Sequence, residues 1–211
     1  MTLTTPTARD QAVTRQRWLT ATTIGWNVVE GVVAIAAGIA AGSVSLIGFG
    51  LDSGVEVSAA VILVWRLAQE RRTGCKQEVD KRAQRLIAVS FAALAIYVGV
   101  ESVRDLLLAH QPEVSPVGIA IAALSLVVMP VLARAKRRLA PVIGSRAVEA
   151  EATQTVLCAL MSGGLLLGLG ANAALGWWWA DPTAGLFIAA LAAYETVNVW
   201  RAESLEHTCC G

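Results

Sequence analysis

Two acidic residues in an otherwise apolar stretch are spaced so that they can act together. Asp52 and Glu56 are four positions apart, which on a helix places both side chains on one face, about one turn from each other. Two carboxylates at that separation repel each other, so they need either a shared cation or a proton on one of them. A divalent metal ion supplies the first remedy and a proton the second, which is the physical basis of an exchanger. The structural alternative is that buried Ser or Thr side chains hydrogen-bond to both carboxylates.

A second group of polar residues occurs in a later apolar stretch, at Glu151, Gln154, Thr155 and Cys158. Gln154 and Cys158 are again four apart, and helical geometry places Glu151, Thr155 and Cys158 within about 60° of one another around the axis. One side of this helix therefore offers a carboxylate, an amide, a hydroxyl and a thiol. Each also has a structural interpretation on its own. A Cys in an apolar helix is often a small apolar filler, and Gln154 could bond to a neighbouring helix.

Further polar residues interrupt the first and last apolar stretches. Asn27 and Glu30 lie in the first, and Glu195 and Asn198 lie in the last. We expect Glu30 to line a water path or to relay protons. Glu195 lies about one turn from the end of its stretch, and we expect it to reach the membrane interface.

The composition of the chain makes these acidic residues unusual. Of 211 residues, 55% are hydrophobic and 16% are charged, whereas a soluble domain is about 45–50% apolar and about 25% charged. The formal net charge of +1 predicts no nucleic-acid partner, and 4 cysteines are too few for a disulfide-rich secreted scaffold. A carboxylate at the centre of a bilayer costs roughly 2.5 kcal/mol or more, so such residues usually face a cavity and serve function.

Six apolar stretches are long enough to cross a bilayer, which takes roughly 20 residues. The predicted spans are about 18–41, 43–65, 86–108, 116–133, 147–169 and 183–200. Residues 1–17 are polar and Thr-rich, so we expect no cleavable signal peptide. The sequence therefore predicts an all-α membrane protein with six transmembrane helices. It has a polar N-terminal segment (1–17), a transmembrane domain (18–200) and a short tail (201–211) without a C-terminal domain.

The positive charges predict the orientation of these spans. Cations fall in the N-terminal segment, between the second and third spans, between the fourth and fifth spans (Lys136 among them) and after the sixth span, all on one side. Only Arg104 lies near the other side. Six of the seven tryptophans lie at predicted span ends, where indole rings prefer the headgroup layer. Because cytoplasmic loops carry the excess of Lys and Arg, both termini are predicted to be cytoplasmic.

Three motifs resemble the transmembrane part of the cation diffusion facilitator family. Residues 42–56, GSVSLIGFGLDSGVE, resemble its span-two motif, in which two acidic or His ligands lie four apart after a Gly-Ser-Leu-Ala-Leu-like start. Residues 145–158, SRAVEAEATQTVLC, resemble the span-five segment with its His/Asp-x-x-x-Asp pair. Residues 181–189, DPTAGLFIA, resemble the Asp-Pro start of the sixth helix. The first and third matches are the specific ones.

The resemblance implies a cation-efflux bundle that binds one divalent metal ion between the second and fifth helices and exports it in exchange for protons. Carried over by position, the ligands are Asp52, Glu56, Gln154 and Cys158. The second pair departs from the family pattern, because an amide and a thiol stand where the family has His or Asp; Glu151 could replace Gln154. Carboxylate and thiolate ligands suit Zn²⁺ or Cd²⁺ better than Mg²⁺ or Ca²⁺. Co²⁺, Ni²⁺ and Mn²⁺ are the other candidates.

These features together predict a multi-pass transporter of the cell membrane rather than an enzyme, with no resident cofactor. Its partners would be the metal ion, protons and the lipid bilayer, and a homodimer would form through the transmembrane helices. The alternative is a metal-binding accessory or regulatory membrane protein that does not transport. In the tail, His207, Cys209 and Cys210 could capture a soft metal ion, or the two cysteines could be inert or lipidated.

Overall fold

The computed structural model of the chain contains six α-helices, and no strand among the residues that it describes, which are 8–73, 77–143 and 146–205. Side chains are described in these ranges except at 8–10, 13, 59, 62–73, 77–84, 143, 146–151 and 202–205. The helices are α1 (Ala8–Ala41), α2 (Val44–Thr73), α3 (Gln77–Leu108), α4 (Pro116–Ile143), α5 (Arg146–Leu175) and α6 (Ala180–Leu205). The predicted all-α fold with six helices is confirmed.

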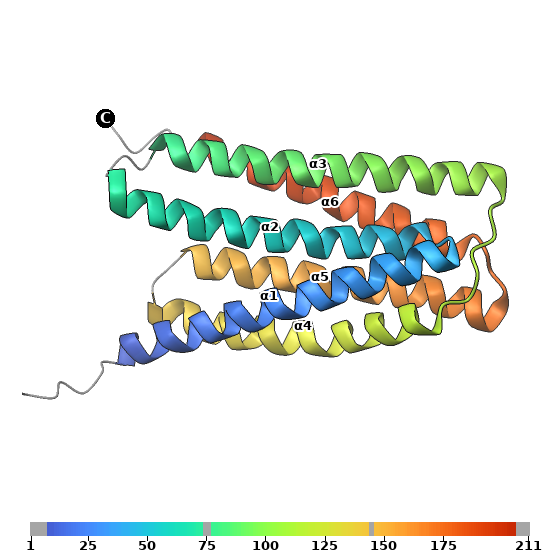
Figure 1. Cartoon of the computed structure of the whole chain (residues 1–211), viewed down its shortest axis with the longest axis horizontal. Helices are drawn as coiled ribbons and strands as arrows, with labels where there is room; N and C mark the ends of the chain where they lie inside the picture. Colours follow the sequence, from blue (N-terminus) through green and yellow to red (C-terminus); the bar gives the residue numbers. More distant parts are fainter. Residues whose placement is uncertain (1–7, 74–76, 144–145, 206–211) are drawn as a thin grey trace, which may run out of the picture.

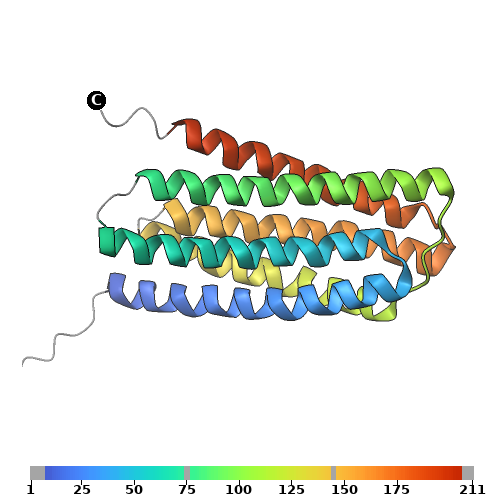
Figure 2. The ribbon, with the colours of Figure 1, turned by 45° about the horizontal axis from the view of Figure 1, so that its top comes forward.

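The six helices run side by side along one long axis, and α1 begins at the same end of the bundle at which α6 ends (Figure 1). Helix α1 packs against α2 and α4, and α5 packs against α4 and α6. Helix α3 packs against α2 and α6, with α6 crossing behind it at an angle (Figure 2). This up-and-down arrangement agrees with an even number of spans.

The helices are longer than the predicted spans. Helix α1 already begins at Ala8, within the segment predicted to precede the first span, and α4 continues to Ile143 rather than ending near residue 133. Hydropathy marks where an apolar stretch ends, but Lys, Arg and Ala are good helix formers and extend the helix beyond it. Lys136 therefore lies within α4 and not in a connection.

Four of the helices are apolar and long enough to cross a membrane, judged over the described residues: Thr14–Ala41, Arg85–Leu108, Pro116–Val142 and Ala152–Leu175. Helices α2 and α6 are not among these four. Each carries two acidic residues within its predicted span or at its start, namely Asp52 and Glu56 in α2 and Asp181 and Glu195 in α6. The outer surface is rich in exposed apolar side chains, including Val32, Ile39, Leu107 and Leu167. Such a surface is suited to lipid.

One end of the bundle is held together by a polar clasp between α2 and α6. Gly42 adopts a φ of 65° between α1 and α2, and Ser43 then caps α2 by accepting a hydrogen bond from the Leu46 N–H at 3.2 Å. The Ser43 hydroxyl donates to Oδ1 of Asp181 at 2.6 Å, and the Ser45 hydroxyl donates to the same oxygen. This clasp connects the motif at the start of α2 to the Asp at the start of α6.

Helices α1 and α2 approach closely where two glycines face each other. A Cβ at Gly31 would lie 3.1 Å from the Gly50 carbonyl oxygen, and a Cβ at Gly50 would lie 3.0 Å from the Gly31 carbonyl oxygen. Gly31 follows Glu30, and Gly50 precedes Asp52 by two positions. The glycine contact therefore sets how near the acidic residues of α1 and α2 come to each other.

We expect Gly50→Ala to destabilise the fold by about 1–3 kcal/mol, because the added methyl group would lie 2.9 Å from the Ile35 nitrogen, in backbone that cannot move aside cheaply. Thermal unfolding in detergent measures the loss. Gly54→Ala on the same helix is the matched control, because a Cβ there meets nothing within 4 Å. Equal stability of the two variants would contradict the role assigned to the glycine contact.

Candidate metal site

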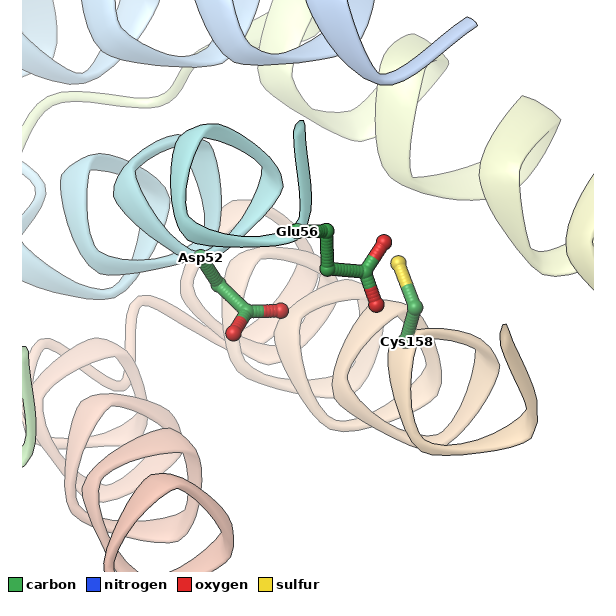
Figure 3. Close-up of side chains that lie close together, drawn as sticks. All are labelled: Asp52, Glu56 and Cys158. Carbon is green, nitrogen blue, oxygen red and sulfur yellow. The ribbon is translucent and has the colours of Figure 1, made fainter. Parts of the chain in front are cut away.

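Helices α2 and α5 bring three potential metal ligands together in the interior of the bundle. Asp52 and Glu56 project from α2 toward α5, from which Cys158 projects back (Figure 3). One ligand atom from each of the three residues lies within 4.8 Å of the others. Asp52 is 2% exposed and Cys158 is 1% exposed, while Glu56 is half-buried. Three of the sequence-predicted ligands therefore meet, although their helices are far apart in the chain.

The Asp52 carboxylate has an unsatisfied oxygen. Its Oδ1 atom is buried and has no hydrogen-bond partner in the part of the chain that the structure describes. The structural alternative, in which Ser or Thr side chains satisfy this oxygen, therefore does not apply to it. A buried polar atom without a partner is costly, and a bound cation or a proton would remove that cost.

Helix α1 supplies a hydrogen bond to the second acid of the cluster. The Asn27 side-chain amide donates to Oε2 of Glu56. Asn27 is itself buried. The hydrogen bond fixes the direction of the Glu56 carboxylate, so α1 takes part in forming the site although the predicted ligands come from α2 and α5 alone.

Glu30 on α1 is a third buried acid at the edge of this cluster. Its carboxylate accepts hydrogen bonds from Trp26 Nε1 at 2.7 Å and from the Ser53 hydroxyl at 2.6 Å. Its Oε1 atom also accepts a hydrogen bond from the Cys158 thiol, with a sulfur–oxygen distance of 3.8 Å. From the sequence alone, Glu30 was expected only to line a water path or to relay protons. The signal in the sequence was a polar residue inside an apolar stretch. The direction in which the Glu30 side chain points could not be predicted from it.

The other two predicted ligands are Gln154 and Glu151. Gln154 lies one turn before Cys158 on α5 and is half-buried. Among the described residues it makes no hydrogen bond to Asp52, Glu56 or Cys158. Glu151 belongs to α5, but its side chain lies outside the described residues, as do those of Cys75, His207, Cys209 and Cys210.

Lys136 is a site residue that the sequence analysis placed wrongly, in a basic cytoplasmic connection. It lies in α4, is 0% exposed, and its Nζ atom donates a hydrogen bond to the Thr155 hydroxyl on α5 at 3.2 Å. Its ammonium group also attracts the Glu56 carboxylate. Tertiary packing explains the burial of Lys136, because α4 packs along α5 and a cation on the inner face of α4 is enclosed by the bundle.

The chemistry of this arrangement is that of cation binding. Two carboxylates and a thiol provide oxygen and sulfur ligands, which together suit Zn²⁺ or Cd²⁺. Zinc–oxygen bonds of about 2.0–2.2 Å and zinc–sulfur bonds of about 2.3 Å require the ligand atoms to move closer than their present spread. Side-chain rotation about an enclosed ion could achieve this.

The comparison with known families agrees with this geometry. A family model described as the cation efflux transmembrane domain matches residues 22–206. The match runs from the middle of α1 to the end of α6 and includes every residue of the cluster. All three motifs of the sequence analysis lie within it.

We expect Lys136→Gln to tighten divalent-cation binding roughly tenfold, because a buried positive charge near Glu56 opposes a second cation there. Titration calorimetry of the purified protein with Cd²⁺ measures the affinity. Arg137→Gln removes an exposed charge from the neighbouring position of α4 and serves as the matched control. Unchanged affinity in the Lys136 variant would show that its charge does not act on the site.

Proposed function

Since the chain belongs to the cation efflux family, which is a family of membrane transporters and not of enzymes, we propose that it exports a divalent transition-metal ion from the cytoplasm in exchange for protons. The transported ion would be zinc-like, and the protein would act in the cell membrane with both termini in the cytoplasm. The sequence supports this orientation through the one-sided distribution of Lys and Arg.

The observation that carries the proposal is the unsatisfied Asp52 oxygen beside Glu56 and Cys158. A structural acid would use its buried oxygens in hydrogen bonds, whereas an acid that receives an ion has a free oxygen directed at the ion's position. Asp52 Oδ1 is buried and has no hydrogen-bond partner among the described residues. One ligand atom from each of Asp52, Glu56 and Cys158 lies within 4.8 Å of the others.

Transport would follow from exposing this site to each side of the membrane in turn. In the inward-facing state, ionised Asp52 and Glu56 bind the ion together with the Cys158 thiolate. The helices then rock against each other, and the site opens outward. Protons that enter from outside neutralise the carboxylates and the thiolate, which releases the ion.

The coupling to protons rests on the ligand types. Carboxylates and thiols bind a metal ion in their deprotonated forms, so binding of the ion releases protons and becomes weaker as the pH falls. Every ligand proposed here can carry a proton. An exchange of metal for protons therefore needs no additional residue.

The mixture of ligands supports a zinc-like ion. Mg²⁺ and Ca²⁺ prefer sites made of oxygen ligands alone. A thiolate next to carboxylates favours Zn²⁺ and Cd²⁺, with Co²⁺, Ni²⁺ and Mn²⁺ as weaker candidates. Exchanging Cys158 for an oxygen ligand should shift this preference toward harder ions.

Flux into proteoliposomes containing a metal-sensitive dye tests the proposal. An imposed proton gradient should drive uptake of Zn²⁺ or Cd²⁺, and a protonophore should abolish it. We expect Asp52→Ala and Cys158→Ala to lower the flux at least roughly tenfold, because each removes a ligand. Glu113→Ala, which removes an exposed carboxylate outside the cluster, is the matched control and should transport normally.

The possible outcomes separate the two candidate functions. Metal binding that depends on Asp52 but is not accompanied by flux would identify a non-transporting accessory or regulatory protein. Flux that is unaffected by Asp52→Ala would show that the ion takes another route and would contradict the proposed mechanism.

A further inference from the structure

Glu30 is a buried carboxylate that the proposed mechanism has not yet used. It lies on α1, is 0% exposed, and its Oε1 atom is 3.8 Å from the Cys158 sulfur. Two different helices, α1 and α5, therefore place ligand-type atoms next to each other at the edge of the cluster.

The distance between these two atoms fits ligands of a common ion. For a tetrahedral zinc ion with a sulfur ligand at about 2.3 Å and an oxygen ligand at about 2.0–2.2 Å, the two ligand atoms lie about 3.5–3.7 Å apart. The separation of 3.8 Å between Glu30 Oε1 and Cys158 Sγ is close to this value. The other three ligands already lie within 4.8 Å of one another.

The surroundings of Glu30 are those of an oriented ligand. Trp26, Ser53 and the Cys158 thiol each donate one hydrogen bond to its carboxylate, whereas an ionised carboxylate has about four acceptor positions. These hydrogen bonds fix the direction of the group. Ligating carboxylates are commonly held in this way. When an ion binds, the Cys158 thiol loses its proton, and the position that this proton occupies becomes free for the ion.

Gln154 is a weaker candidate for the same position. Its amide is uncharged, and among the described residues it makes no hydrogen bond to the other three ligands. Glu30 in its place would add negative charge to the site. The attraction between Lys136 and Glu56 offsets part of that charge.

We propose that Glu30 is the fourth ligand of the transported ion, so that the binding site joins α1, α2 and α5 rather than α2 and α5 alone. The inference rests on the proposed function, because it assigns a further ligand to the same site. The unpaired buried oxygen of Asp52 is independent support for an ion at this place.

X-ray absorption spectroscopy of the Cd²⁺-bound protein can test whether position 30 touches the ion. In a variant with Cys75, Cys209 and Cys210 replaced by Ser, Cys158 is the one cysteine that remains, so it alone can supply a thiolate ligand. The protein should then show one sulfur neighbour. Glu30→His should add the outer-shell scattering of an imidazole, which is absent from the parent protein. Glu101→His, which places a histidine on α3 instead, should show no imidazole on the ion.

The affinity for Cd²⁺ provides the second readout. We expect Glu30→Ala to weaken binding at least roughly tenfold, whereas Glu113→Ala, which removes an exposed carboxylate outside the cluster, should change it little. If Glu30→His does not fold, Glu30→Asp takes its place: loss of affinity of the same order supports the proposal, because the shorter side chain cannot reach the ion.

The result that overturns the proposal is a parent protein that binds Cd²⁺ through sulfur and transports it, with no imidazole signal in Glu30→His and unchanged affinity in Glu30→Ala. A parent protein with no sulfur signal and no flux would instead remove the proposed function itself. The two failures are therefore distinguishable.

Discussion

The burial of two neighbouring carboxylates, Asp52 and Glu56, is the constraint on which the rest of the structure depends. Removing an ionised group from water is expensive unless charges or hydrogen bonds compensate it. The bundle compensates Glu56 with the Asn27 amide and with attraction to Lys136. Within the part of the chain that the structure describes, Asp52 Oδ1 has no such compensation. A bound ion or a proton at this oxygen would supply it.

The packing of the bundle would allow the proposed site to open. Helix α2 packs mainly against α1, α3 and α6, and α5 packs mainly against α4 and α6, while α2 and α5 contact each other less than either contacts these neighbours. The Ser43–Asp181 hydrogen bond fixes α2 to α6 at one end. Helices α2 and α5 are thus each packed more tightly against their other neighbours than against each other. This packing suits a rocking motion that exposes the cluster without unfolding any helix.

Patterns that repeat within one helix were predictable from the sequence, and contacts between helices were not. The spacing of Asp52 and Glu56 fixes a shared face, and an apolar stretch fixes a helix, so the six helices and two of the three cluster residues follow from local rules. The resemblance to a known family was needed to pair α2 with α5 and so to single out Cys158. The direction of Glu30 and the burial of Lys136 depend on how α1 and α4 rotate about their axes. Hydropathy even indicated the opposite for Lys136, because a cation next to an apolar stretch ordinarily marks its end.

An ion at this site would link binding to movement. Its proposed ligands come from α1 and α2 on one side of the lighter contact and from α5 on the other, so a bound ion would hold α2 and α5 together, and their separation would require that the ion be released or replaced. Protons neutralise the carboxylates as the ion does, but they do not hold α2 and α5 together, because a protonated carboxylate no longer attracts the opposite helix through a shared charge. The loaded and the protonated protein should therefore differ in how readily α2 and α5 separate. A ligand shifts a conformational equilibrium only through such a difference.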